Sequence, residues 1–565
     1  MYNRFIKTLC LGFIFLLTFV SCNDYQEQID ELESQISNIS VQSLRDKIAQ
    51  LETEIKTLRD SEDISKLQIE IDELKRQLGL VVHVEADLEK PEYEISDFIW
   101  RAMNFFYFWQ DDVNLLANTR YDDRNQYIQM IKENSDPEKF FDRLLYEKGE
   151  KYGDRFSWFI DDYIEQEKDF QGVSKDHGMQ WRPSRTTNNS NDLFGYVQLV
   201  HAGSNAEEQE VKRGMLFTKV DNQPLTLNNY REYWLGDVDS FTIHLAKAEF
   251  NDAGSFTGFV ETGQTITLTA QEDFARDPII VNKVIEKGNH KIGYLFYNQF
   301  VYNNTRHIQL NDVFDEFKSE GITDLIVDLR YNRGGSSATS DFIASAISGK
   351  GENDIISKSF WNPNFLNTLY GGADALIEYF PDDVPLRGSE TSVMINKLDL
   401  ERVFFITSRF SASASEQLIN NLDPYMEVIQ VGETTVGKND GSFTLYDIEE
   451  VDPRWYTSRN NGAVNPNHNN AIQPLVVKSG NAEEFYEFES GLVPDYEIIE
   501  RVLDLGTIGD ASERLLARVL EVIAPSGNRY LDANHYDVEF EVMELPEDQT
   551  GFLIYELETL FPTQE

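Results

Sequence analysis

The sequence is poor in cysteine, in basic residues and in long apolar runs, and each shortage excludes a class of protein. Two cysteines among 565 residues, Cys10 and Cys22, cannot supply a disulfide framework. The 50 basic residues face 98 acidic ones, a formal net charge of -48, so no basic face remains to neutralise the phosphates of a nucleic acid. The apolar stretch near the N-terminus, residues 9–20, is too short to span a bilayer comfortably.

Sites for metals and nucleotides are also missing from the sequence. The eight histidines form no cluster with cysteine at metal-ligand spacing, and no phosphate-binding glycine loop of the nucleotide-binding kinds occurs. We therefore expect no metal and no cofactor. The acidic residues are spread along the chain, which is typical of a solvated surface. The length leaves room for three or four domains.

The first 22 residues are typical of a lipoprotein signal peptide. Arg4 and Lys7 precede the apolar stretch, and Ser21 and Cys22 follow it. Cys22 would become the lipidated first residue of the mature chain, and Cys10 would leave with the signal. We therefore expect a lipoprotein of the cell envelope that is held on a membrane by its lipid, facing the periplasm or the cell surface. The alternative is a transmembrane anchor.

Residues 23–80 carry a heptad pattern. Apolar residues recur there with 3,4,3 spacing, interrupted at 39–44 and 58–64. The pattern predicts a coiled-coil stalk and hence a homo-oligomer. The alternative is a single amphipathic helix that folds against the rest of the protein.

Residues 92–165 are predicted to form a helical domain. Aromatic and aliphatic side chains recur at helical spacing, for example from Phe98 to Trp109 and from Phe140 to Leu145, which predicts about three packed helices. Such a stripe is far more often a core than a cofactor site, so we assign it no chemistry.

Residues 166–285 are predicted to form a small β-rich domain. Phe194, Gly195 and Tyr196 lie in an apolar-Gly-apolar loop that runs into a strand, and this loop resembles the carboxylate-binding loop of PDZ domains. The resemblance implies that backbone amides around Gly195 hold the terminal carboxylate of a peptide. The strand that starts at Tyr196 would pair with the peptide main chain. A generic β-hairpin is the alternative.

Residues 286–525 contain a serine turn followed by a lysine. Ser413 lies between an apolar strand at 403–407 and a helical segment at 416–422, and Lys438 follows the next strand. A serine hydroxyl needs a base at neutral pH, and a lysine serves only if burial lowers its pKa from ~10.4 toward ~7 to 8. The backbone N–H of Ala414, at the start of the helix, is a candidate oxyanion donor.

A glycine pair follows the strand at 325–330. Gly334 and Gly335 end the run Tyr331-Asn-Arg-Gly-Gly, and paired glycines let a backbone approach a ligand closely. One of the two glycines would supply the second oxyanion donor. An ordinary tight turn is the alternative if the motif is considered alone.

With these three turns in this order and approximate spacing, the chain resembles the C-terminal processing (tail-specific) serine peptidases. The resemblance covers about residues 95–525 and is most specific over 291–445. It implies an α/β fold with a mixed sheet, in which Ser413 is the nucleophile and Lys438 the general base. It also implies that Ala414 and Gly334 or Gly335 form the oxyanion hole.

The sequence departs from the family pattern at two positions. Ser442 stands where many members carry a glutamine that orients the lysine, and either Ser442 or Asn439 would have to replace it. Pro424 stands where many members carry an aspartate, although Asp423 is adjacent.

Taken together, the sequence predicts an α/β multidomain serine endopeptidase. It would cleave unfolded or extended protein tails in the cell envelope, through a Ser-Lys dyad and an acyl-enzyme, with protein or peptide substrates that have accessible C-termini. The alternative is a catalytically inactive lipoprotein of the same fold that binds peptides or other ligands. Residues 526–565 show only weak alternating apolar patterns, and we assign them no role.

Overall fold

The computed structural model describes residues 91–121, 124–187, 190–234, 238–367, 376–386, 388–389, 391–448, 464–525, 540–543 and 552–554. The predicted signal peptide, Cys22 and the predicted coiled coil lie outside these residues. No helix among the described residues combines the length and the apolarity that crossing a membrane requires. The contacts divide the chain into two units, Met1–Asp97 with Asn118–Ser135, and Phe98–Ala117 with Asp136–Glu565.

The described part of the first unit is helical. It contains the start of α5 (Pro91–Phe106), the 3-10 turn η3 (Asn118–Arg120) and α6 (Arg124–Lys132). The Ser96 hydroxyl donates to the Asn134 carbonyl at 2.7 Å, and the Tyr127 hydroxyl donates to Asp97 Oδ1 at 2.7 Å. Both bonds are buried. An unpaired polar group in such a place would destabilise the fold, and these two bonds avoid that.

The second unit begins with the end of α5 and with short helices. The Asp136 carboxylate caps α7 by accepting the Lys139 N–H, and Pro137 occupies the first helical turn. The chain then enters β1, whose partner strand β22 also pairs with β21, close after the predicted lysine turn. The bounds are η1 Gln110–Asp112, η2 Asn114–Leu116, α7 Pro137–Arg143, β1 Trp158–Ile160, α8 Tyr163–Phe170, β21 Leu445–Tyr446 and β22 Ala471–Gln473.

A sheet with the strand order β3-β4-β5-β7-β8, and with β6 beside β5, follows; we call it the PDZ-like sheet after the sequence prediction for this region. Its inward side chains, including Trp181, Val197 and Phe217, form a separate apolar core. The bounds are β2 Val173–Asp176, β3 Met179–Arg185, β4 Leu193–Val200, α9 Asn205–Glu208, β5 Leu216–Val220, β6 Gln223–Pro224, α10 Tyr230–Trp234, β7 Ser240–Phe250, β8 Phe256–Thr269 and β9 Gln271–Ala275, with β9 pairing β2.

The predicted peptide-binding role of Phe194, Gly195 and Tyr196 does not fit this sheet. These residues are buried in β4, which pairs along its length with β3 and, at Gly195 and Tyr196, with β5. A strand that pairs on both sides offers no free edge to a peptide. Gly195 is explained by packing instead, because a Cβ atom there would lie 2.1 Å from the Phe217 ring. The outer strand of the sheet on this side is β3.

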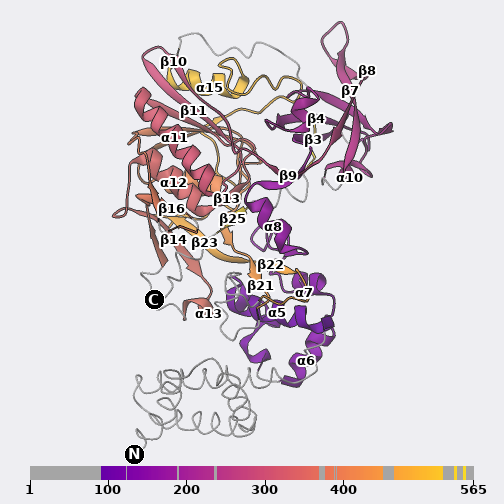
Figure 1. Ribbon diagram of the computed structural model, residues 1–565, viewed down its shortest axis with the longest axis vertical. Coiled ribbons are helices and arrows are strands. Elements are labelled where there is room, and N and C mark those ends of the chain that lie inside the picture. The colour runs from indigo at the N-terminus through magenta and orange to yellow at the C-terminus, as the bar shows by residue number, and fades with distance from the viewer. Residues whose placement is uncertain are drawn as a thin grey trace, which may run out of the picture. The chain divides into compact units, whose positions relative to one another are not determined.

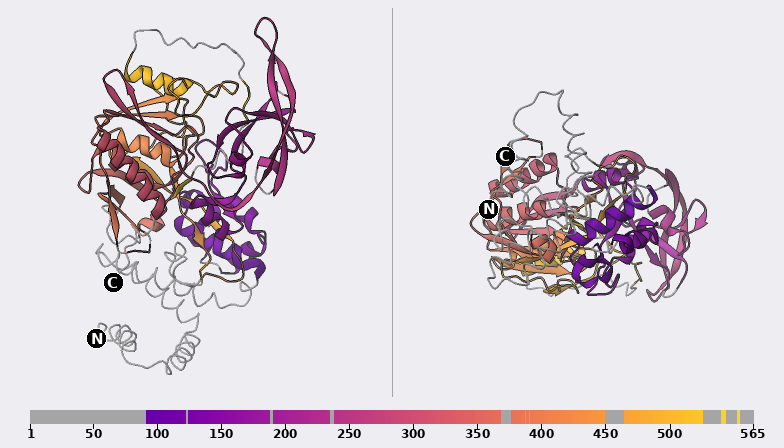
Figure 2. Two further views of the ribbon diagram at one scale, coloured as in Figure 1. Left: turned by 45° about the horizontal axis from the view of Figure 1, so that its top comes forward. Right: turned by 90° about the horizontal axis from the view of Figure 1, so that it is seen from below.

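A six-stranded mixed sheet forms the centre of the predicted peptidase region (Figure 1). Its order is β10-β11-β12-β18-β19-β24, antiparallel between β10 and β11 and parallel elsewhere. Helices α11 and α12 lie on one face and α15 lies on the other (Figures 1 and 2). The predicted α/β fold with a mixed sheet is thus confirmed. The bounds are β10 Ile279–Lys287, β11 His290–Tyr297, α11 Asn304–Glu320, β12 Asp324–Asp328, α12 Ser337–Ser348, β18 Arg402–Thr407, β19 Glu427–Gly432, β24 Tyr496–Glu497 and α15 Arg514–Ile523.

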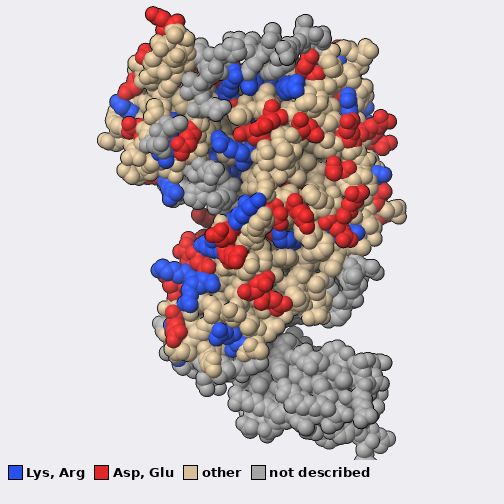
Figure 3. Space-filling view, turned by 180° about the vertical axis from the view of Figure 1, so that it is seen from behind, with Lys and Arg blue, Asp and Glu red and all other residues tan. Residues whose placement is uncertain are grey.

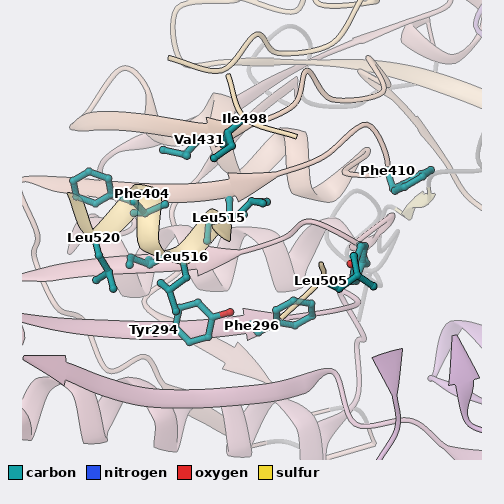
Figure 4. Close-up of a cluster of buried hydrophobic side chains, with 14 of the residues drawn as sticks. Tyr294, Phe296, Phe404, Phe410, Val431, Ile498, Leu505, Leu515, Leu516 and Leu520 are labelled. Atoms are coloured by element: carbon teal, nitrogen blue, oxygen red, sulfur yellow. The ribbon is translucent and has the colours of Figure 1, made fainter. Parts of the chain in front are cut away.

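Helix α15 is held by an apolar contact with the sheet. Leu516 and Leu520 are buried against sheet residues that include Tyr294 and Phe404 (Figure 4). Burying one such side chain contributes about 1.5–3 kcal/mol, so the leucine face of α15 outweighs the weak helix propensity of a short segment.

A second mixed sheet lies beside the first. It contains β13, which begins with the predicted glycine pair, and β20, which follows Lys438. Its order is β13-β25-β20-β23-β14-β15. The bounds are β13 Gly334–Ser336, β14 Ile355–Trp361, α13 Pro363–Leu366, β15 Ile377–Tyr379, β16 Asp383–Pro385, β17 Ser392–Met394, α14 Ala414–Leu422, β20 Asp440–Ser442, β23 Leu475–Asn481 and β25 Phe552–Ile554, with β16 pairing β17.

The charged side chains of the described residues intermingle on the face drawn in Figure 3. Acidic and basic groups lie next to one another there, in keeping with the spread of acidic residues along the sequence.

Candidate active site

Ser413 occupies the turn between β18 and α14, as the sequence predicts. Its backbone has φ 62° and ψ -112°, a conformation that costs a non-glycine residue about 1–3 kcal/mol and that recurs at functional sites. Ser413 is 0% exposed, and its Oγ has no hydrogen-bond partner among the described residues. The strained turn therefore holds a hydroxyl that is not engaged in the structure.

The other serines of this turn explain why the segment is so rich in serine. The hydroxyls of Ser408, Ser411 and Ser415 each donate to a backbone carbonyl of the glycine-turn segment 329–332, the last two at 2.8 and 3.0 Å. These bonds fasten the serine turn to the chain that carries the glycine pair. Ser413 alone keeps its hydroxyl unpaired, and this distinguishes it from its neighbours as the candidate nucleophile.

The two glycines of the predicted oxyanion hole are not equivalent. The Gly334 N–H donates to Asn332 Oδ1 at 2.8 Å and is therefore occupied. Gly335 has φ 137°, and a Cβ atom there would lie 2.0 Å from the Phe300 carbonyl oxygen, so only glycine fits. Ala414 is the first residue of α14, where no helical carbonyl accepts its N–H. The geometry thus favours Gly335 with Ala414 over Gly334.

Lys438 is buried, with 1% of its surface exposed. It follows Gly437, whose positive φ of 84° and close approach to the Glu489 carbonyl exclude a side chain. The Lys438 Nζ lies 5.2 Å from the centre of the Phe156 ring. Burial lowers the pKa of Lys438 to about 7, although the carboxylates of Asp440, Asp154 and Glu416 oppose that shift. A substantial neutral fraction at physiological pH is what a lysine base requires.

Glu416 ties the serine turn to the lysine turn, a role that the sequence did not reveal. One carboxylate oxygen, Oε2, accepts the N–H of Ser413 at 2.7 Å and the N–H of Lys438 at 2.9 Å. The other, Oε1, accepts the Thr435 hydroxyl at 2.5 Å and the Gly437 N–H at 2.6 Å. Burial raises the pKa of Glu416, and the hydrogen bonds from these four donors oppose that rise. The two predicted catalytic residues are thus joined through one buried carboxylate.

Residues 154–156 also reach the lysine turn. Arg155 Nη2 donates to the Gly437 carbonyl at 2.5 Å, and Phe156 forms part of the apolar surroundings of the amine. Asp154 is buried and accepts hydrogen bonds from the hydroxyls of Tyr107 and Ser157, at 2.8 and 2.6 Å, while burial raises its pKa. From the sequence, this segment was predicted only to be part of the helical domain at 92–165.

An amide from a distant strand stands beside Ser442, the position that departs from the family pattern. Gln473 Nε2, from β22, donates to Ser442 Oγ at 3.1 Å, and the Thr444 hydroxyl donates to Gln473 Oε1 at 2.7 Å. Asn439, the other residue considered as a replacement, donates its side-chain amide to the Tyr486 carbonyl instead. An amide group from another part of the chain thus lies beside Ser442.

Arg330 anchors the strand that leads to the glycine pair. It is 0% exposed and makes hydrogen bonds to Asp328, to Glu513 at 2.8 and 3.0 Å and to Glu500 at 3.0 Å. Glu500 also binds Arg213 of the PDZ-like region at 2.5 Å. A charge network thus joins that region to the strand of the oxyanion hole. Among the described residues, no group of three or more His, Cys, Asp or Glu is placed to hold a metal ion.

Comparison with known proteins gives the family. Residues 291–452 match the model of peptidase family S41, and residues 94–158 match the model of the peptidase S41 N-terminal domain. Over these two stretches the chain is similar to peptidase family S41. This confirms the resemblance to the C-terminal processing peptidases and makes the protein a serine-type peptidase by class. The segment around Asp154 falls in the N-terminal family match, and Ser413 and Lys438 fall in the peptidase match.

The S41 fold recurs in solved structures. A putative S41 protease from Bacteroides fragilis is 20% identical, with 75% of this chain and 96% of that chain covered and a TM-score of 0.55, which shows a shared fold. A photosystem II D1 C-terminal processing protease is 16% identical, with 76% and 97% covered and a TM-score of 0.42. No curated protein matches the chain.

Proposed function

We propose that this S41 peptidase is a serine endopeptidase with Ser413 as nucleophile and Lys438 as general base. The proposal depends on one arrangement. The buried hydroxyl of Ser413 is unpaired, and the Glu416 carboxylate binds the backbone N–H groups of both Ser413 and Lys438. Burial lowers the pKa of Lys438 to about 7. A structural lysine would be expected at the surface with an ordinary pKa, because burying an ammonium group is costly.

The reaction follows from these positions. Neutral Lys438 takes the Ser413 proton as Oγ attacks a peptide carbonyl, and the N–H groups of Ala414 and Gly335 stabilise the oxyanion. The ammonium of Lys438 then protonates the leaving amine. Water, deprotonated by the same amine, hydrolyses the acyl-enzyme and restores the serine. Gln473, through Ser442, supports the lysine turn from the side where many family members carry a glutamine.

The substrates we propose are unfolded or extended protein tails in the cell envelope. An extended backbone suits a peptidase built on sheets, since strand addition supplies main-chain hydrogen bonds without a fixed sequence. Lipidation at Cys22 and a coiled-coil stalk at 23–80 would place a homo-oligomer on the membrane.

The alternative of an inactive binding protein is less well supported by the site. The missing glutamine beside the lysine favours this alternative, but Gln473 brings an amide to Ser442, the residue that stands at the glutamine position. A receptor would also gain nothing from the depressed pKa of Lys438.

A serine-directed phosphonate tests the nucleophile. We expect the purified chain to be labelled and Ser413→Ala not to be labelled, while Ser415→Ala, which removes a hydroxyl from the same turn, is still labelled. Undiminished labelling of Ser413→Ala would refute the assignment. Digestion of an unfolded protein by the wild type, lost in Lys438→Ala, would exclude the inactive alternative.

A further inference from the structure

Two short segments of the C-terminal tail lie on surfaces that a protease substrate would use. Residues 540–543 lie along β3, the outer strand of the PDZ-like sheet. β25 lies between β13, which holds the glycine pair, and β20, which follows the lysine turn. We propose that the enzyme's own tail is a substrate, which is captured on β3, threaded past the oxyanion hole and cut by Ser413. The proposal rests on the function proposed above.

The first segment adds a strand to β3. Val542 faces Ser184 in an antiparallel bridge, with the Arg185 N–H donating to the Glu541 carbonyl at 3.0 Å and the Met543 N–H donating to the Pro183 carbonyl at 3.1 Å. This is strand addition at a sheet edge, in which the main chain supplies the binding.

Side chains fix the position of this segment on the sheet. The Phe540 ring lies 5.0 Å from the ring of Phe194, 5.2 Å from Phe256 and 5.9 Å from Phe259. Val542 is 8% exposed. An aromatic anchor among three rings contributes apolar burial and favourable ring geometry. Phe194 thus contacts the tail through its side chain, although its backbone has no free edge.

The second segment lies between β13, which begins with the glycine pair, and β20, which follows the lysine turn. β25 pairs in parallel with β13, with Phe552, Leu553 and Ile554 opposite Gly334, Gly335 and Ser336. On its other side Ile554 pairs with Ser442 of β20, which begins two residues after Lys438. The backbone of the tail therefore runs between β13, which holds the glycine pair, and β20, which follows the lysine turn. Figure 1 labels β13 and β25 next to each other.

The orientation of Gly335 decides what this pairing means. On the other side of β13, the Phe300 N–H donates to the Gly334 carbonyl and the Ser336 N–H donates to the Phe300 carbonyl. Since backbone groups alternate along a strand, the N–H of Gly335 points to the side where β25 runs. In a serine peptidase, the oxygen of the carbonyl under attack accepts a hydrogen bond from such an N–H. The tail would thus take the place of the scissile segment. Ser413 and Lys438 are 0% and 1% exposed.

The cut would divide the chain within or beside 552–554. Ser413 Oγ forms an ester with the carbonyl carbon, the C–N bond breaks, and the new amine takes the proton that Lys438 accepted from Ser413. Water then splits the ester and returns a proton to Ser413. The products are a shortened enzyme and a free peptide that ends at Glu565. Until the cut, the tail competes with every other substrate for the cleft.

Intact-mass measurement of the full chain tests the proposal. We expect the wild type to lose the residues beyond the cut and Ser413→Ala to retain Glu565. If the wild type keeps Glu565 while it digests a separate unfolded protein, the tail is not a substrate and the proposed function stands. If the wild type cuts neither, both proposals fail. A cut elsewhere in the tail would also overturn the placement at β25.

Backbone variants test the capture on β3. Met543→Pro removes the N–H that binds the Pro183 carbonyl, whereas Met543→Leu keeps that N–H and a similar side-chain volume. In pulse-labelled cells we expect Met543→Pro to slow tail loss about fivefold or more, the equivalent of one net hydrogen bond, and Met543→Leu to match the wild type. Digestion of a separate unfolded protein by Met543→Pro shows that this variant has folded. Equal rates of tail loss in the two variants would refute capture by strand addition.

Discussion

The pH dependence of the reaction follows from the surroundings of Lys438, and one isosteric change isolates its largest electrostatic contribution. Asp440 comes first among the charges that raise the pKa of Lys438 against burial. Its Oδ1 accepts no hydrogen bond among the described residues and lies 3.6 Å from Lys478 Nζ. Asp440→Asn therefore removes a negative charge while keeping the shape of the side chain.

The magnitude can be worked out from the pKa. In the wild type, with the pKa of Lys438 at about 7, activity should rise through that pH, because only the neutral amine accepts the serine proton. Loss of a nearby carboxylate lowers the pKa of an amine, by about one unit for a partner within ~6 Å. At pH 6 the neutral fraction would rise from about one tenth to about one half, so the reaction should be about fivefold faster. Above pH 8.5 the two proteins should react at similar rates.

The assay is the pH profile of kcat/KM with an unfolded fluorescent protein, or the rate of phosphonate labelling. Asp447→Asn is the matched control, since Asp447 is a buried carboxylate that binds Asn465 and His468 and is absent from the charges acting on Lys438. An acidic limb at the same pH in Asp440→Asn and in the wild type would refute the reasoning. So would a wild-type profile without a limb near pH 7.

Two further substitutions test the anchors of the site. Glu416→Gln turns one oxygen into an amide group that faces two donors, so we expect a loss of about 2–4 kcal/mol in the free energy of unfolding, measured with urea, and a fall in kcat larger than the rise in KM; an unchanged urea midpoint would contradict this. Arg330→Ala leaves Asp328 and Glu513 buried without their cation and should cost about 3–5 kcal/mol in the same assay, and a loss below 1 kcal/mol would show that the network is dispensable.

The sequence predicted the parts of the site that are encoded in contiguous residues. A strand, a small-residue turn and a helix around Ser413 can be recognised from local hydrophobic spacing, and so can the strand that leads to Lys438. The glycine pair was also predicted, but the sequence could not decide whether Gly334 or Gly335 supplies the second oxyanion donor. Only the hydrogen bond from Gly334 to Asn332 separates them, and a side-chain contact of that kind leaves no pattern in the sequence.

The contacts that depend on distant residues could not be predicted. Gln473 reaches Ser442 from another strand, and Glu513 reaches Arg330 across 183 positions of the chain. Neither pairing produces a periodicity. The strand that starts at Tyr196 was predicted, but the residues before it, which were predicted as a loop, belong to the same strand β4. The neighbours of β4 were not predicted, because alternation gives the two faces of a strand and says nothing about which strands border it.

The contacts of Asp154, Arg155 and Phe156 make the N-terminal region a structural part of the chemistry. Arg155 holds the carbonyl just before Lys438, and Phe156 shields its amine. A chain shortened to begin at the PDZ-like sheet would keep Ser413, Lys438 and the oxyanion donors, but it would lack Phe156. Water would then reach the Lys438 amine, which would remain protonated at neutral pH. The shortest active chain should therefore include residues upstream of the peptidase fold. Loss of that helical region during evolution would abolish activity while Ser413 remained in place.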